Sequence, residues 1–273
     1  MAAGVICLSA AMSAMAQQAA PASPPAPSAT GSQQSPAGKD TSGGTHITPE
    51  QAKQLFALVD DLMKFSSDET GLPIKSAVKR QLTTRAAVES YLEDKFNEDE
   101  SAKRLQRDEI VLKKFGLLDH DFELKPFLLA LLKEQIEAYY DSKTKTVNML
   151  DWVDVDEQKP VLAHELTHAL QDQSFGIEKW MKGSSGKTDK KDDPSPADII
   201  NDEESSARQA VIEGQAMVVL LDYSLAPTGK TLLNSPQIVQ ALKDGMLVGT
   251  ADTPTFRDAP IFLKEELTFP YRY

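Results

Sequence analysis

Apolar residues recur three or four positions apart over most of the chain after residue 48, which is the spacing of one face of an α-helix. Thr48, Pro49 and Gln51 are typical of a helix start, because the threonine and glutamine side chains can cap backbone N–H groups. Periodic runs lie at 55–63, 88–96, 105–115, 128–136, 207–221 and 238–246, and Pro260 opens a last one. Between them, the segment from Trp180 to Ala197 is rich in Gly, Ser, Lys, Asp and Pro, which predicts a long exposed loop.

The segment 137–150 has the residue pattern of β-strands rather than of a helix. It holds two runs typical of strands on either side of the polar sequence Asp-Ser-Lys-Thr-Lys at 141–145, which predicts a β-hairpin. We therefore expect an α+β fold that is predominantly α-helical, with a small hairpin or sheet. The hairpin is either a plain structural element or an edge to which an extended peptide substrate adds as a further strand.

The first 47 residues predict a targeting segment and a tether. Residues 1–16 are uncharged and end in Ala-Met-Ala, which matches a secretory signal peptide with its cleavage site, although the basic start is missing. Residues 17–47 are rich in Pro, Ala and Ser and predict a disordered tether. We expect a secreted or periplasmic protein. The single cysteine, Cys7, lies in the signal segment, so a metal site in the mature chain must use histidine and carboxylate ligands.

The net charge of the chain indicates which kinds of binding partner are unfavourable. The 273 residues carry a formal net charge of −12, and 26% of them are charged. This balance argues against nucleic acids and anionic membrane surfaces as partners, because both bind basic surfaces. After residue 16, no segment of the sequence is long and apolar enough to predict a membrane span.

The candidate chemistry is concentrated at 161–172, where His164-Glu165-x-x-His168 is flanked by apolar residues. Residues four apart lie on one face of a helix, so His164 and His168 can hold one metal ion together. Glu165 lies one step round the helix, where a carboxylate can take a proton from water at the ion. The alternative is a chance match on an ordinary amphipathic helix.

A third ligand is expected on the helix at 202–221. Glu213 lies on the edge of its apolar face, where a buried carboxylate is costly unless it is paired or ligates a metal. Gly214 in mid-helix costs about 1 kcal/mol against alanine, which close approach to another helix would explain. Glu203 and Glu204 are rival ligands, but carboxylates near a helix start are also favoured by the helix dipole. The sequence therefore ranks Glu213 first.

The blocks 162–172 (LAHELTHALQD) and 211–216 (VIEGQA) together resemble the gluzincin metallopeptidases, whose ligands are the two histidines of the motif and a glutamate on a following helix. Within that clan they are similar to a poorly characterised group of secreted bacterial proteins. The separation of 45 residues between His168 and Glu213 is wider than in the thermolysin-like pattern. The resemblance covers these blocks and the hairpin, and it does not extend to the first hundred residues.

The resemblance implies a zincin-like metallopeptidase with one Zn²⁺ held by His164, His168 and Glu213, and we expect its domain to span 48–273. It implies Glu165 as general base and proton shuttle, and a peptide or protein as substrate. The domain would consist of a helical N-terminal part, 48–125, and a metal-site part, 126–273. The resemblance also implies a chain that continues past the Phe-Pro-Tyr sequence at 269–271.

Other roles stay open at this point. The candidates for stabilising the oxyanion are Tyr139, Tyr140, Tyr223 and Tyr271. Asp172 is placed either to orient a ligand histidine or to end a helix at the surface. Two readings compete with a working peptidase. One is a non-catalytic, zinc-stabilised scaffold whose fourth ligand is a residue such as His120. The other is a latent enzyme in which residues 48–125 cover the cleft.

Overall fold

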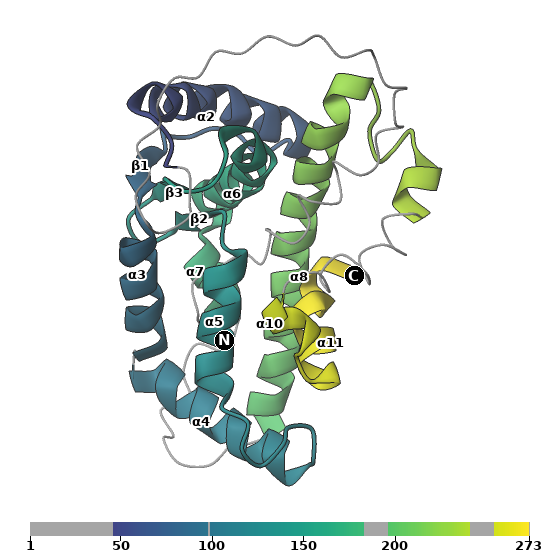
Figure 1. The fold of residues 1–273 in the computed structure, drawn as a ribbon. Helices are drawn as coiled ribbons and strands as arrows, with labels where there is room; N and C mark the ends of the chain where they lie inside the picture. The colour runs from purple at the N-terminus through teal and green to yellow at the C-terminus, as the bar shows by residue number, and fades with distance from the viewer. Residues whose placement is uncertain (1–45, 98, 183–195, 241–253, 273) are drawn as a thin grey trace, which may run out of the picture.

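The computed structural model describes residues 46–97, 99–182, 196–240 and 254–272 (Figure 1). The predicted signal segment and the tether up to residue 45 lie outside these ranges. The helices are α2 (Pro49–Thr70), α3 (Arg85–Asn97), α4 (Asp99–Lys114), α5 (Leu124–Gln135), α6 (Val155–Phe175), α7 (Ile177–Lys182), α8 (Pro196–Leu225), α10 (Pro254–Arg257) and α11 (Ile261–Arg272), and the strands are β1 (Lys79–Thr83), β2 (Ala138–Asp141) and β3 (Thr146–Leu150). The predicted α+β class with mostly helical structure is confirmed.

Helix α2 begins as its sequence predicts. The Thr48 hydroxyl accepts a hydrogen bond from the Gln51 backbone N–H, and the Gln51 side chain accepts one from the Thr48 N–H, at 3.2 and 2.8 Å. The helix ends at Gly71, whose φ of 69° lies in the left-handed region that glycine adopts without strain. Both ends are therefore encoded locally.

The sheet has three strands in the order β1-β3-β2. Strands β2 and β3 pair antiparallel, which confirms the predicted hairpin, and β1 pairs parallel with β3. Strand β1 was not predicted, because its five residues, Lys-Arg-Gln-Leu-Thr, are mostly polar and show no clear apolar alternation. Strand β2 lies at the edge of the sheet.

The sheet separates two apolar clusters. Because side chains alternate along a strand, Ala138 and Tyr140 of β2 face the cluster that contains α2 and α6, whereas Tyr139 faces α3 and α5. The first cluster joins α2, α6, α8 and the sheet in one core. Every residue from 161 to 172 is buried, so α6 is enclosed by α2, α8 and β2 (Figure 1). Polar side chains on this part of α6 must therefore find partners inside the protein.

The predicted loop from Trp180 to Ala197 is wrong at both ends. Trp180 belongs to α7, where the Arg208 guanidinium stacks over its ring at 4.5 Å and its Nε1–H reaches the Arg208 carbonyl oxygen at 3.4 Å. At the other end, Pro196 already begins α8. Contact with α8 thus replaces exposure to water at Trp180. The residues between, 183–195, lie outside the described part, as do residues 241–246 of the helix predicted at 238–246.

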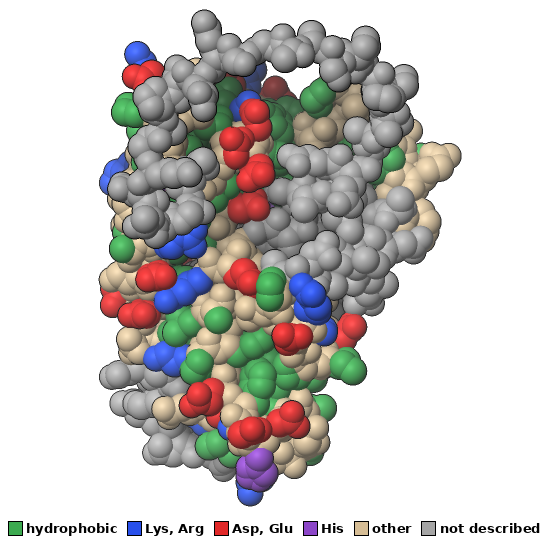
Figure 2. Space-filling view, viewed as in Figure 1, with side chains coloured by type: hydrophobic (Ala, Val, Ile, Leu, Met, Phe, Trp, Pro, Cys, Tyr) green, Lys and Arg blue, Asp and Glu red, His purple; other side chains and the backbone are tan. Residues whose placement is uncertain are grey.

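The distribution of charge on the surface and the apolarity of the helices can both be described. On the face drawn in Figure 2, acidic, basic and apolar side chains are interspersed, and the described residues of this face form no continuous basic area. Within the described ranges, no helix combines the length and apolarity needed to cross a membrane.

The reason proposed for Gly214 is wrong. A Cβ atom added there would meet no heavy atom within 4 Å apart from its own helix, so the glycine does not serve close helix packing. Its neighbours Ile212 and Ala216, by contrast, are at most 1% exposed. Gly214 therefore lies towards open space on α8.

Replacing Gly214 by alanine should raise the free energy of unfolding by about 1 kcal/mol, because alanine costs less entropy in a helix and here meets no obstacle. Denaturant unfolding of the metal-free protein measures the change. Gly229→Ala is the matched control, since space is also open there but φ is 70°, so this variant should be less stable than the wild type. A Gly214→Ala variant that is as destabilised as Gly229→Ala would contradict the prediction.

Candidate metal centre

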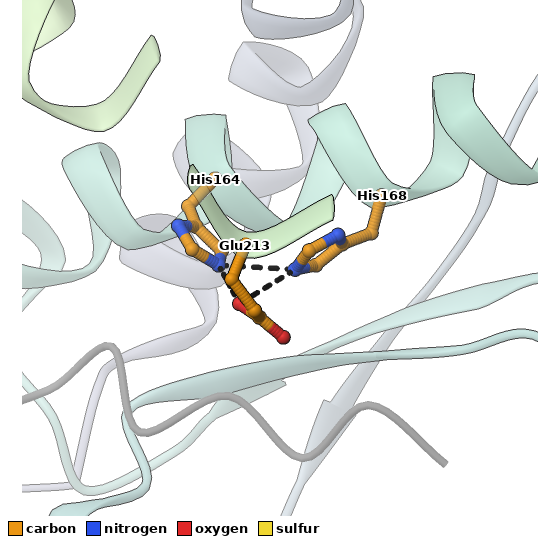
Figure 3. Close-up of side chains that lie close together, drawn as sticks. All are labelled: His164, His168 and Glu213. Carbon is orange, nitrogen blue, oxygen red and sulfur yellow. Dashed lines mark hydrogen bonds and ion pairs between the residues drawn. The ribbon is translucent and has the colours of Figure 1, made fainter. Parts of the chain in front are cut away.

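His164 and His168 of α6 and Glu213 of α8 point towards one another (Figure 3). The two Nε2 atoms lie 3.0 Å apart. Oε2 of Glu213 lies 3.3 Å from Nε2 of His164 and 3.5 Å from Nε2 of His168. The structure thus brings Glu213 to the histidine pair, in the place expected for a third ligand.

This triangle of donor atoms fits a metal ion. Zinc takes histidine nitrogen and carboxylate oxygen at about 2.0–2.2 Å, and a tetrahedron of that size has edges of about 3.3–3.6 Å. The observed separations of 3.0 to 3.5 Å are close to such edges. The three residues could therefore hold one ion, and within the described ranges no fourth His, Cys, Asp or Glu joins the group.

Local helix geometry and helix packing position these side chains. The two histidines lie four residues apart on the same face of α6, and their rings meet edge to face, with centroids 4.7 Å apart and an interplanar angle of 84°. Helix α8 packs against α6, with Val219 in the same apolar cluster as α6 and the Ile212 carbonyl bonded to Gln171, and this packing places Glu213 at the histidine pair. The centre therefore needs one helix for its pair of imidazoles and a second helix for its carboxylate.

The three side chains are at most 1% exposed, which makes their charges interdependent. Burial lowers the pKa of His164 to about 4. Burial also opposes protonation of His168, but the negative charge of Glu213 outweighs it and raises the pKa of His168 to about 9. Burial alone would raise the pKa of Glu213, but the charge of His168 and hydrogen bonds from both imidazoles hold it well below its usual range. Without metal, His168 is the cation that balances Glu213.

Glu165 is fully buried beside this group. Its Oε2 accepts a hydrogen bond of 2.8 Å from the backbone N–H of Tyr140, on the edge strand β2. Its charge is close enough to His168 to raise the pKa of that imidazole further. The carboxylate is thus held between the histidine pair and the edge of the sheet.

Asp172 does not orient a ligand histidine. Its Oδ2 accepts hydrogen bonds from the Tyr140 hydroxyl at 2.8 Å and from the Lys145 ammonium at 2.5 Å, and its Oδ1 accepts one from the Ile177 N–H at 3.1 Å. The contact with His168 is made by Gln171, whose Oε1 lies 2.9 Å from Nδ1 of the imidazole. The sequence contained a signal for Gln171, which was overlooked: it follows His168 by three residues and so shares its helix face.

The remaining candidates lie elsewhere. Glu204 forms an ion pair of 2.6 Å with Arg208, and the side chain of Glu203 is outside the described part. His120, considered as a closing ligand, is exposed between α4 and α5. Neither Glu204 nor His120 belongs to the group formed by His164, His168 and Glu213.

The tyrosines proposed for the oxyanion make other contacts. Tyr140 donates its hydroxyl to Asp172, and Tyr139 stacks on Tyr91 with ring centroids 4.8 Å apart. Tyr223 packs against a ring of α2 and lies ten residues beyond Glu213, which is about 15 Å along a helix. The side chain of Tyr271 is outside the described part. Among the described contacts, none joins these hydroxyls to the three metal-binding candidates.

Comparisons of the chain with models of protein families, with curated proteins and with solved structures found no match in any of the three. The resemblance to gluzincins therefore rests on the two sequence blocks. The buried group of two histidines and one glutamate, which the structure brings together, is consistent with it.

Glu213→Ala should weaken zinc binding by at least a factor of about 100, because it removes the only carboxylate of the donor triangle. Competition with a chelator of known affinity measures the change. Glu204→Ala is the control on the same helix and should leave the affinity unchanged. Equal affinities of the two variants would move the third ligand away from Glu213.

Zinc binding at pH 7 should release about one proton per ion. The raised pKa of His168, about 9, keeps this imidazole protonated in the metal-free protein, whereas His164, with a pKa of about 4, and Glu213, with a lowered pKa, have no proton to lose. The affinity should therefore rise with pH up to about pH 9 and then level off. Calorimetric titration in two buffers of different ionisation enthalpy counts the protons, and a count of zero would show that His168 is neutral without metal.

Proposed function

We propose that the protein is a zinc-dependent metallopeptidase that hydrolyses peptide bonds. The observation that carries the proposal is the position of Glu165, a buried carboxylate between the histidine pair and the edge of β2. An ion with a purely structural role needs its ligands but no further acid–base group, whereas hydrolysis needs a carboxylate at this point. Together with the predicted signal segment, this supports an exported peptidase.

The buried charges support the same conclusion. Two neutral imidazoles bring no charge, and Glu213 and Glu165, which are at most 1% exposed, bring two negative charges when both are ionised. A doubly charged cation would balance them, so that the buried centre becomes neutral.

The four side chains of the centre would then have two different roles, metal binding and proton transfer. His164, His168 and Glu213 would hold the ion, which supplies a Lewis acid and lowers the pKa of water beside it. Glu165 takes a proton from the attacking water and later returns it to the leaving amine. The Tyr140 N–H holds Oε2 of Glu165, so the carboxylate keeps one orientation while it exchanges the proton.

A peptide substrate would lie along strand β2. This strand pairs with β3 on one side only, and the Tyr140 N–H points to the other side, towards Glu165. Because the Tyr140 N–H is already bonded to Glu165, an extended peptide added at this edge would pair with other main-chain groups of β2, close to that carboxylate. The substrate-binding role of the hairpin is part of this proposal, and its structural role is the alternative.

One observation favours a second function, that of a non-catalytic, zinc-stabilised scaffold. The three side chains of the centre are almost completely buried, and a structural ion is commonly enclosed in this way. The latent-enzyme alternative has less support, because α2 of the N-terminal part shares the apolar core with α6. Removal of α2 would expose that core as well as the centre.

Glu165→Gln should lower the rate of peptide hydrolysis by a factor of about 100 to 10,000, since the amide cannot accept the proton. The bound zinc should stay near one equivalent, because Glu165 is not a ligand. Hydrolysis of a labelled unfolded protein, together with the metal content of the same sample, tests both statements. The exposed Glu157 of α6 is the control, and Glu157→Gln should keep full activity.

Loss of zinc from Glu165→Gln would make this residue a ligand rather than a base. A wild-type protein that holds zinc and hydrolyses no peptide bond would favour the scaffold instead.

A further inference from the structure

Gln171 makes three hydrogen bonds inside the protein that connect the two helices of the metal centre. Its side chain is 1% exposed. Oε1 lies 2.9 Å from Nδ1 of His168, and Nε2 donates to the carbonyl oxygen of Ile212 at 3.0 Å and to Oε1 of Gln215 at 2.9 Å. Ile212 directly precedes Glu213. One amide therefore contacts a histidine of α6 and the backbone next to the carboxylate of α8.

These contacts determine which nitrogen of His168 can bind a metal. The Ile212 carbonyl can only accept a hydrogen bond, so the NH₂ group of Gln171 faces it and Oε1 faces His168. Oε1 can only accept, so Nδ1 of His168 must carry a proton. In the neutral imidazole the lone pair then lies on Nε2, the atom that points at His164 and Glu213.

We propose that Gln171 is the positioning residue of the metal centre. It selects Nε2 of His168 as the metal-binding atom and fixes α8 beside α6 at the residue before Glu213, and it thereby sets the affinity for the ion. Being neutral, it adds no charge to the balance between the ion and the two carboxylates. The inference rests on the metal-binding part of the proposed function and does not depend on hydrolysis.

The chain provides a matched control two residues further on. Gln173 of α6 also makes three hydrogen bonds through its amide, accepting from the N–H groups of Lys75 and Ser76 and donating to the Ser76 carbonyl. These bonds fasten α6 to the segment after α2 and do not involve a metal-binding candidate. Gln171→Leu and Gln173→Leu therefore remove equal numbers of hydrogen bonds from the same helix with different expected effects on metal binding.

The experiment measures zinc affinity of the full chain by competition with a chelator, and thermal stability of the metal-free protein. Gln171→Leu should bind zinc about 10- to 100-fold more weakly than the wild type, as is typical for loss of the partner of a ligand histidine. Gln173→Leu should keep wild-type affinity while losing stability. Gln171→Glu should recover affinity relative to Gln171→Leu, since a carboxylate accepts from Nδ1–H, although it cannot donate to Ile212 and should be less stable.

Equal affinities of Gln171→Leu and the wild type would overturn the inference, and so would equal losses in Gln171→Leu and Gln173→Leu. Should Gln171→Leu fail to fold, nitrogen-15 NMR of histidine in the zinc-loaded wild type decides. A slowly exchanging proton on Nδ1 of His168 supports the inference, and a proton on Nε2 overturns it. A wild-type chain that binds zinc without hydrolysing peptides would contradict the peptidase and leave this inference intact, whereas failure to bind zinc would refute both.

Discussion

The structure depends on the burial of two imidazoles and two carboxylates in the middle of an apolar core. His164, His168, Glu165 and Glu213 are each at most 1% exposed. Water cannot solvate them there, so their charges and hydrogen bonds must be balanced by one another, by the surrounding protein and by any ion that they hold. The packing of α8 along α6 creates this requirement, because it places Glu213 against the histidine pair.

Elements far apart in the chain hold several polar groups of α6. Helix α2 contributes Ser66, whose hydroxyl donates to the Ala163 carbonyl at 3.1 Å, next to His164. Strand β2 contributes the N–H that holds Glu165, and the same tyrosine is anchored through its hydroxyl to Asp172. The sheet therefore contributes to the order of the centre, because one residue of β2 holds both Glu165 and Asp172.

The contact with His168 that was considered for Asp172 is made by its neighbour Gln171. Asp172, four residues after His168, was placed either to orient that histidine or to end the helix, and it fastens the hairpin to the end of α6 through Tyr140 and Lys145. Gln171, which lies three residues from His168, orients that histidine without adding charge. Gly214 likewise has no packing role, since its position on α8 is open. The tertiary surroundings of each residue therefore decide its role: the hairpin for Asp172, α8 for Gln171 and open space for Gly214.

By itself, the sequence determined the local features: the capped start of α2, the hairpin, and the histidine pair with Glu165 beside it. These follow from contacts between residues a few positions apart, whose geometry is a property of the helix or turn. Glu213 could be ranked first because an unexplained carboxylate on an apolar face needs a buried partner. Only the tertiary structure decided the third strand β1, which is stabilised by pairing with β3, and the role of Gln171, whose partner Ile212 lies 41 residues away. The contact with Ile212 and the pairing of β1 depend on how distant segments pack, whereas the contact between Gln171 and His168 follows from their spacing of three residues on α6.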